Sequence, residues 1–229
     1  MFSIEGNIKS ILRDISLSSE KSVCKSGDVS LVCVTKTIPA GMISEAISAG
    51  VKIVGESRVE EALEKYELLP KNIEWHMIGH LQTRKVKEAI KIFDLIHSVD
   101  TLRLAEEIDK RAGAAGKIQD ILLEVNIAEE ESKYGFKKDD VITALREMSR
   151  LKNIRVLGLM TMAPLDEDPE KSRPVFRGLR ELSEAIKKEN ITNILMKHLS
   201  MGMSQDYGVA VEEGATLVRI GSAVFKEGG

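Results

Sequence analysis

Short apolar runs alternate with amphipathic stretches about eight times along the chain. The apolar runs predict strands at residues 29–35, 52–55, 73–78, 94–99, 118–126, 154–160, 194–199 and 216–220. Helical spacing of apolar residues predicts helices between them, including 57–69, 101–113, 139–151, 171–190 and 204–213. An amphipathic stretch over residues 2–19 predicts an extra N-terminal helix.

The alternation of strands and helices points to an α/β fold. Strands that are almost continuously apolar are typical of a parallel sheet with both faces buried. Eight units in 229 residues give roughly 29 residues each, about the size of a βα pair. This favours a closed (β/α)₈ TIM barrel over an open doubly wound sheet. No linker-like segment or shift in composition divides the chain, so a single domain over residues 1–229 is expected.

Composition and charge exclude some classes of protein. The chain is 43% hydrophobic and 30% charged, with a net charge of −3, which argues against a nucleic-acid binder that relies on bulk charge. No apolar run approaches the roughly 20 residues of a membrane span. The N-terminus lacks the features of a signal peptide. We therefore expect a cytoplasmic protein with no nucleic-acid or membrane partner.

Cysteines and histidines give poor support for a metal site. Cys24 and Cys33 are too far apart for a CxxC motif. The four histidines, His76, His80, His97 and His198, show no HExxH or similar spacing. We predict no bound metal.

Lys36 is the first residue with candidate chemistry. It directly follows the apolar run of the first predicted strand. An amine among apolar neighbours loses its proton more readily, and a neutral lysine can attack a carbonyl group and form a Schiff base. A lysine that merely ends a strand and reaches water is the alternative.

Two later segments suggest a phosphate site. Barrel chemistry gathers at the C-terminal ends of the strands, and the loops after strands seven and eight often hold phosphate. Here these segments are residues 199–204 (LSMGMS) and 219–223 (RIGSA), each with a serine and a glycine before a predicted helix. A reactive lysine beside a phosphate site suits pyridoxal 5′-phosphate (PLP) or a phosphorylated sugar.

Several segments, in order along nearly the whole chain, resemble the YggS/PROSC family of PLP homeostasis proteins. They are residues 34–37, 54–58, 75–83 (WHMIGHLQT), 96–100, 124–127 with 133–136, 158–161, 199–204 and 218–222. The resemblance implies one (β/α)₈ barrel similar to the N-terminal domain of alanine racemase. It also implies a monomer that buffers PLP or delivers it, with PLP-requiring apo-enzymes as possible recipients.

The resemblance also assigns roles to individual residues. Lys36 would hold PLP as a Schiff base, and Arg219 would face the pyridine nitrogen. Ser57 stands where the family usually has an asparagine, so its contact with the cofactor is an expectation only. The phosphate site would consist of four residues, with the methionine acting through its backbone N–H: Ser200, Met201, Gly221 and Ser222.

Arg219 favours a binding protein over an enzyme. An arginine stays charged and cannot accept the proton that a carboxylate would keep on the pyridine nitrogen, so PLP would be a weaker electron sink. A racemase or lyase of low activity remains an alternative and would need an acid or base such as Tyr134, Glu124 or His80. A lysine aldolase for a phosphorylated sugar is a third possibility.

Overall fold

The computed structural model describes residues 3–23, 29–130 and 133–226. Cys24 lies outside the described residues. Within them, Cys33 is a buried free thiol, and burial raises its pKa to about 12, which keeps the thiol protonated and inert.

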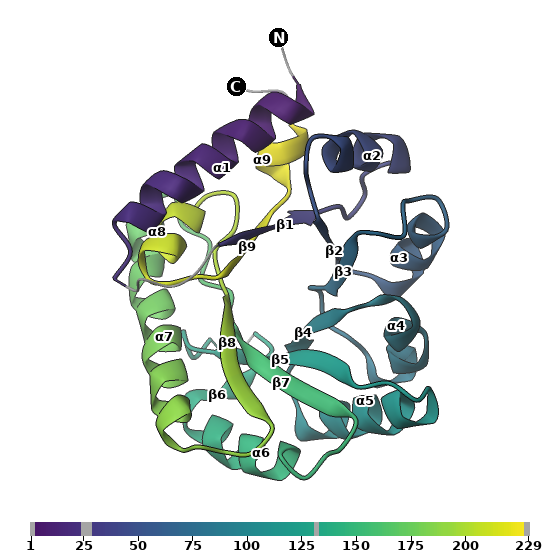
Figure 1. The fold of residues 1–229 in the computed structure, drawn as a ribbon. Helices are drawn as coiled ribbons and strands as arrows, with labels where there is room; N and C mark the ends of the chain where they lie inside the picture. The colour runs from purple at the N-terminus through teal and green to yellow at the C-terminus, as the bar shows by residue number, and fades with distance from the viewer. Residues whose placement is uncertain (1–2, 24–28, 131–132, 227–229) are drawn as a thin grey trace.

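Parallel strands close into a ring (Figure 1). Each strand pairs with its neighbour, and the last pairs with the first. The eight strands of the ring, among the described residues, are β1 Ser30–Val34, β2 Ile53–Glu56, β3 Glu74–Met77, β4 Leu95–Val99, β5 Gln119–Asn126, β7 Ile154–Met160, β8 Ile194–Ser200 and β9 Leu217–Ile220. The predicted (β/α)₈ barrel is confirmed, and its strands match the predicted apolar runs to within one or two residues.

One further strand lies outside the ring. β6 (Phe136–Lys137) pairs in parallel with the end of β5, at Val125 and Asn126. Its two residues are too short to give a periodic apolar pattern, so the sequence did not predict it.

Helices form an outer layer around the ring (Figure 1). They are α2 Ala40–Ser48, α3 Val59–Tyr66, α4 Val86–Ile92, α5 Leu102–Ala114, α6 Val141–Met148, α7 Arg173–Lys188, α8 Tyr207–Glu212 and α9 Ser222–Phe225, with 3₁₀ turns η1 Thr83–Lys85, η2 Lys138–Asp140 and η3 Pro169–Ser172. Several helices are shorter than predicted because 3₁₀ or other turns take up their first residues. No helix in the described part of the chain is long and apolar enough to cross a membrane.

The predicted N-terminal helix is present as α1 (Ile4–Glu20). Its buried face repeats at helical spacing, and Ser3 caps its start by accepting a hydrogen bond from the Gly6 N–H at 2.9 Å. It lies along α8 and α9 (Figure 1), where the Tyr207 hydroxyl donates to Asp14. The first helix of the chain therefore packs against its last two helices. Its buried residues are Ile4, Ile8, Ile11 and Ile15.

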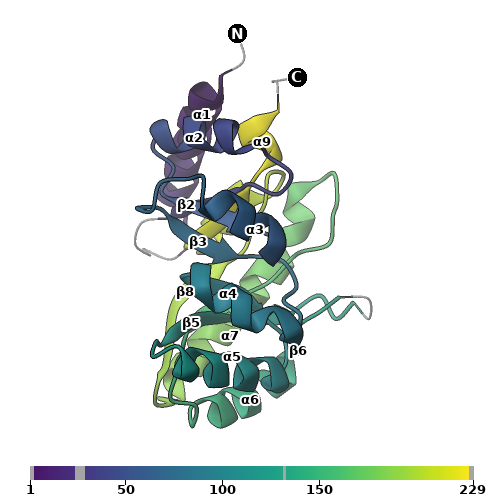
Figure 2. The same cartoon turned by 90° about the vertical axis from the view of Figure 1, so that its right-hand side faces the viewer.

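Side chains alternate between the barrel interior and the layer beneath the helices. Val32 belongs to a small interior cluster with Leu122 and Leu217, whereas Cys33 packs in the larger outer core. Continuing this alternation along β1 places Lys36 on the interior side, at the C-terminal end of the strand. The segments after β5 and β7 extend beyond the same end of the ring (Figure 2).

Candidate functional site

A cavity of about 360 Å³ opens at the C-terminal ends of the strands. Its wall comes from the end of β1, the β7–η3 loop, the β8–α8 segment and the end of β9. Of the residues predicted for a cofactor site, the structure brings four to this cavity: Lys36, Arg219, Gly221 and Ser222.

The backbone around Lys36 is fixed from outside the barrel wall. The Thr35 hydroxyl donates to the buried Glu56 carboxylate at 2.7 Å. The Lys65 amine, on α3, donates to the same carboxylate and to the Thr35 carbonyl, each at 2.7 Å. Thr37 then turns the chain with a φ of 63°, a left-handed conformation that costs energy for a β-branched residue. These contacts direct Lys36 into the cavity.

Arg219 is a buried cation at the cavity wall, only 4% exposed. Its Nη1 donates to the Ser200 hydroxyl at 2.5 Å and its Nη2 to the Thr161 carbonyl at 2.9 Å. Burial lowers the pKa of Arg219 to about 10, against the opposing influence of Glu124 and Asp206. The guanidinium therefore stays charged at neutral pH and is held in one orientation.

Ser200 and Met201, both expected at the phosphate site, have partners within the protein. The Ser200 side chain is fully buried between Arg219 and His97. Met201 packs into the outer core, and its N–H donates to the Leu217 carbonyl at 3.1 Å. Neither residue lines the cavity. Their phosphate contacts remain an expectation from the resemblance, since the Ser200 hydroxyl contacts Arg219 and His97 and the Met201 N–H donates to a carbonyl group.

Ser57 also lies away from this cavity. It borders a separate hollow with His80 and Arg84, at the ends of β2 and β3. Its backbone is packed so closely on Gly79 that a Cβ there would come within 2.4 Å of the Ser57 carbonyl oxygen. The structure gives no support for a contact between Ser57 and a ligand held by Lys36.

The β8–α8 segment supplies a serine that the sequence analysis did not select. Ser204 lines the cavity. The segment is held by Asp206, whose carboxylate accepts from the Met203 N–H at 2.7 Å and from the Ser172 hydroxyl at 3.0 Å. Gly202 allows the tight turn, with a φ of 90° and no room for a Cβ against Ala210.

A second group of ionisable side chains lies at the same end of the barrel. Burial raises the pKa of Glu124 to about 7, helped by Asp100 and opposed by Arg219. His80 pairs with Asp100 at 3.1 Å and stacks on Tyr134 with ring centroids 3.9 Å apart. Glu124 can therefore gain or lose a proton near neutral pH.

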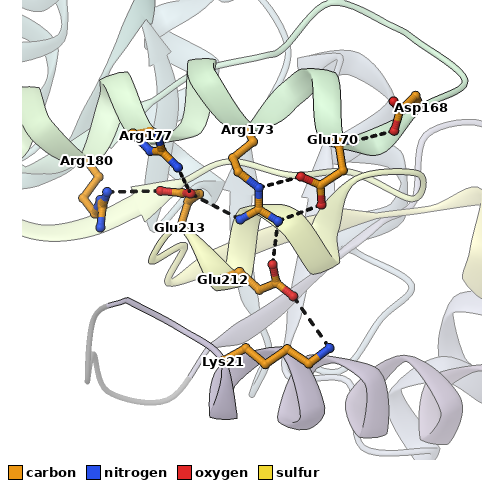
Figure 3. Close-up of polar contacts among 8 residues, drawn as sticks. All are labelled: Lys21, Asp168, Glu170, Arg173, Arg177, Arg180, Glu212 and Glu213. Carbon is orange, nitrogen blue, oxygen red and sulfur yellow. Dashed lines mark hydrogen bonds and ion pairs between the residues drawn. The ribbon is translucent and has the colours of Figure 1, made fainter.

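An ion cluster joins α7 to α8 (Figure 3). Glu213, whose side chain is 1% exposed, contacts three arginines of this region, and Arg173 also bridges Glu170 and Glu212. Lys21, just after α1, approaches Glu212 at 3.9 Å. We call this set the α7–α8 ion cluster: Lys21, Glu170, Arg173, Arg177, Arg180, Glu212 and Glu213. It stabilises the helices that flank the cavity wall.

The barrel with a lysine at its mouth matches a known class of protein. Residues 17–227 match the family model described as alanine racemase, N-terminal domain. An alanine racemase from Clostridium difficile 630 shares the fold with a TM-score of 0.68 at 15% identity, and the match covers 95% of this chain and 56% of that one.

More similar proteins define the family within this class. A pyridoxal phosphate homeostasis protein of Aquifex aeolicus is 44% identical over 218 residues, 95% of each chain. PipY of Synechococcus elongatus, in a structure with PLP bound, is 33% identical with a TM-score of 0.84, covering 98% of this chain and 100% of that one. The chain belongs to the family of pyridoxal phosphate homeostasis proteins.

Proposed function

We propose that this protein binds PLP in the 360 Å³ cavity and takes part in PLP homeostasis by buffering or delivering the cofactor. The observation that carries the proposal is Lys36, an amine directed into a cavity that also holds the Arg219 cation. The cavity is of a size common for small-molecule sites. The PLP-bound structure of PipY and the names of the relatives support the same ligand.

The residues of the cavity fit the chemical groups of PLP. The Lys36 amine would condense with the aldehyde to a Schiff base, releasing water. Gly221, Ser222 and Ser204 border the cavity where strands seven and eight of the ring end, the usual place for phosphate in barrels. Arg219 would lie on the side of the pyridine nitrogen. Contacts of Ser57, Ser200 and Met201 with the cofactor stay expectations from the resemblance, because none of the three lines the cavity.

We further propose that the protein lacks robust catalytic activity. When bound, PLP supplies an electron sink that is strongest with a protonated ring nitrogen. Arg219 keeps its own proton, because its pKa stays near 10, and it gives none of the support that a carboxylate would give to that protonated form. Delivery to PLP-requiring apo-enzymes and a monomeric state belong to this proposal as expectations from the family. A single domain over residues 1–229 and a cytoplasmic location belong to it as expectations from the sequence.

A racemase or lyase of low activity is the second candidate, and Glu124 is the observation that favours it. A carboxyl with a pKa of about 7 is suited to general acid–base chemistry. Exchange of the α-hydrogen of amino acids for solvent deuterium, lost in Glu124→Gln, would support this alternative. No exchange with any common amino acid would leave the binding function.

The first test is a visible absorption spectrum of the purified protein with added PLP. We expect a yellow protein, and borohydride reduction followed by peptide mapping should place PLP on Lys36. Lys36→Ala should lose the band. Lys117→Ala is the matched control, because burial lowers the pKa of this lysine and its amine donates to the Ile90 carbonyl away from the cavity. A protein that stays colourless with PLP would contradict the proposal.

A further inference from the structure

A line of polar groups crosses the barrel interior and ends at the cavity. It starts at Glu74, whose side chain is 65% exposed at the beginning of β3 and lies 3.6 Å from Nε2 of His76. Nδ1 of His76 is 3.0 Å from Nε2 of His97, and Nδ1 of His97 is 2.9 Å from the Ser200 hydroxyl. Ser200 in turn contacts Arg219. Everything between Glu74 and the cavity is buried.

The chemistry of Arg219 sets the direction of these hydrogen bonds. A guanidinium can only donate, so the Ser200 oxygen accepts and its single proton must go elsewhere. The acceptor within reach is Nδ1 of His97. Burial lowers the pKa of His97 well below its ordinary value, so the ring is neutral and carries one proton. That proton must then be on Nε2.

The same reasoning continues to the far end of the line. Nε2–H of His97 donates to Nδ1 of His76, which leaves the His76 proton on Nε2, facing the Glu74 carboxylate. This contact lowers the pKa of Glu74 below its ordinary value. The reverse direction would leave the Ser200 proton with no acceptor among the described residues, and it would point a bare ring nitrogen of His76 at a carboxylate.

We propose that His97 is a positioning residue for Arg219. Held by His76 and Glu74, it fixes the Ser200 hydroxyl as an acceptor, and this hydroxyl orients the guanidinium in the cavity. The inference rests on the proposed function for its ligand, since this line of residues would set the orientation in which the Arg219 guanidinium contacts PLP. Hydrogen bonds near the ring nitrogen are one of the means by which proteins tune this cofactor.

The direction of the line can be tested without any ligand. Nitrogen-15 NMR of the histidine rings distinguishes the two tautomers. We expect Nε2 of both His97 and His76 to carry a ring proton and Nδ1 of both to accept a hydrogen bond. In Glu74→Leu, both rings should keep these tautomers, because Nε2–H of His97 still requires Nδ1 of His76 as its acceptor. A His97 ring protonated on Nδ1 in the unmodified protein would overturn the proposal.

The positioning role is tested with PLP itself. We expect His97→Phe and Ser200→Ala to raise the PLP dissociation constant about tenfold, the effect of one hydrogen bond to a charged group, and to shift the visible absorption maximum. His97→Asn, which keeps an acceptor near Nδ1, and Ser200→Thr should restore both values. Should His97→Phe not fold, Ser200→Ala decides the outcome.

Ser98→Ala is the matched control. Ser98 is a fully buried serine next to His97 on β4, but its hydroxyl donates to the Gly79 carbonyl at 2.6 Å. The Ser98→Ala variant should lose some stability, and its visible absorption spectrum with PLP should not change. Spectra and dissociation constants of His97→Phe and Ser200→Ala equal to those of the unmodified protein would overturn the inference. If the unmodified protein binds no PLP, the proposed function fails, and the tautomers still decide the direction of the line.

Discussion

Two buried glutamates show how differently this fold treats charge. Glu124 is 4% exposed at the barrel mouth, and Glu213 is 1% exposed between α7 and α8. Burial raises the pKa of Glu124 to about 7, and Asp100 adds to that effect. Burial also acts to raise the pKa of Glu213, but hydrogen bonds with Arg177 and Arg173 outweigh it and the pKa falls below its ordinary value.

The difference lies in the neighbours rather than in the burial. Within the α7–α8 ion cluster, Glu213 meets three arginines at 3.1 to 3.2 Å, so its charge contributes to stability. At the mouth, the single arginine that offsets Glu124 is already committed to Ser200 and Thr161. An incompletely neutralised group of this kind is typical of a functional site, whereas the ion cluster is structural.

Removal of Glu213 should have the largest effect. Glu213→Ala leaves three arginines facing one another beside α8, and breaking a buried ion pair on one side typically costs about 4 kcal/mol. We expect this loss in the free energy of unfolding, measured with urea at pH 7.5. Because the pKa of Glu213 is lowered, its contribution is present at neutral pH and is lost as the pH falls through that lowered value.

Glu184→Ala provides the control for this experiment. Glu184 lies on the same helix, α7, but is 54% exposed and pairs with Lys187 at the surface. Its removal should leave the unfolding midpoint nearly unchanged. A loss in Glu213→Ala no larger than in Glu184→Ala would show that the α7–α8 ion cluster does not hold the two helices together.

Glu124 should give the opposite dependence on pH. A carboxyl whose folded pKa is raised binds a proton more tightly in the folded state, so stability falls as the pH rises from 4.5 to about 7. The shift corresponds to about 3 kcal/mol, at roughly 1.4 kcal/mol per unit. Relative to Glu124→Gln, the protein should lose up to this amount between pH 4.5 and 8. A constant difference between the two unfolding curves would contradict the raised pKa.

The ring of strands was predictable because parallel strands that are buried on both faces appear in the sequence as runs of apolar residues. The run before Lys36 and the run that contains Arg219 both appear as strands of the ring. β6 and the 3₁₀ turns were not predictable, because two to four residues carry no periodicity. The short α8 illustrates the same limit, since its first predicted residues form the turn held by Asp206.

The candidate site was predictable only in part. Lys36 and Gly221 reach the cavity because both follow strand ends on the interior side. Met201 does not, because it lies one residue beyond the end of β8 and its side chain packs in the outer core. Ser200 has two partners, His97 on β4 and Arg219 on β9. The contacts among these three side chains depend on how the ring of strands closes. The alternation of side chains along the strands could have indicated that His76 and His97 both face the barrel interior. It could not have indicated which of the two donates their hydrogen bond.

A glycine between the two regions should show an intermediate effect. In Gly202→Ala, the new Cβ would lie 2.5 Å from the Cβ of Ala210, at a φ of 90°. Steric overlap and a left-handed backbone together cost about 2 kcal/mol. The same change should weaken PLP binding, since Gly202 precedes the cavity residue Ser204. Gly41→Ala is the control, because a Cβ there meets nothing within 4 Å and lies in α2; no loss of stability is expected.

The smallest effect on stability is expected for an ion pair that is exposed to water. Lys9 and Glu5 form an ion pair of 2.6 Å on α1, with side chains 73% and 62% exposed. The distance is shorter than any contact of Glu213, yet water solvates both partners, and such pairs contribute little. Lys9→Ala should leave the thermal unfolding midpoint within experimental error. A loss approaching that of Glu213→Ala would mean that proximity of charges, and not their burial among several partners, governs stability in this fold.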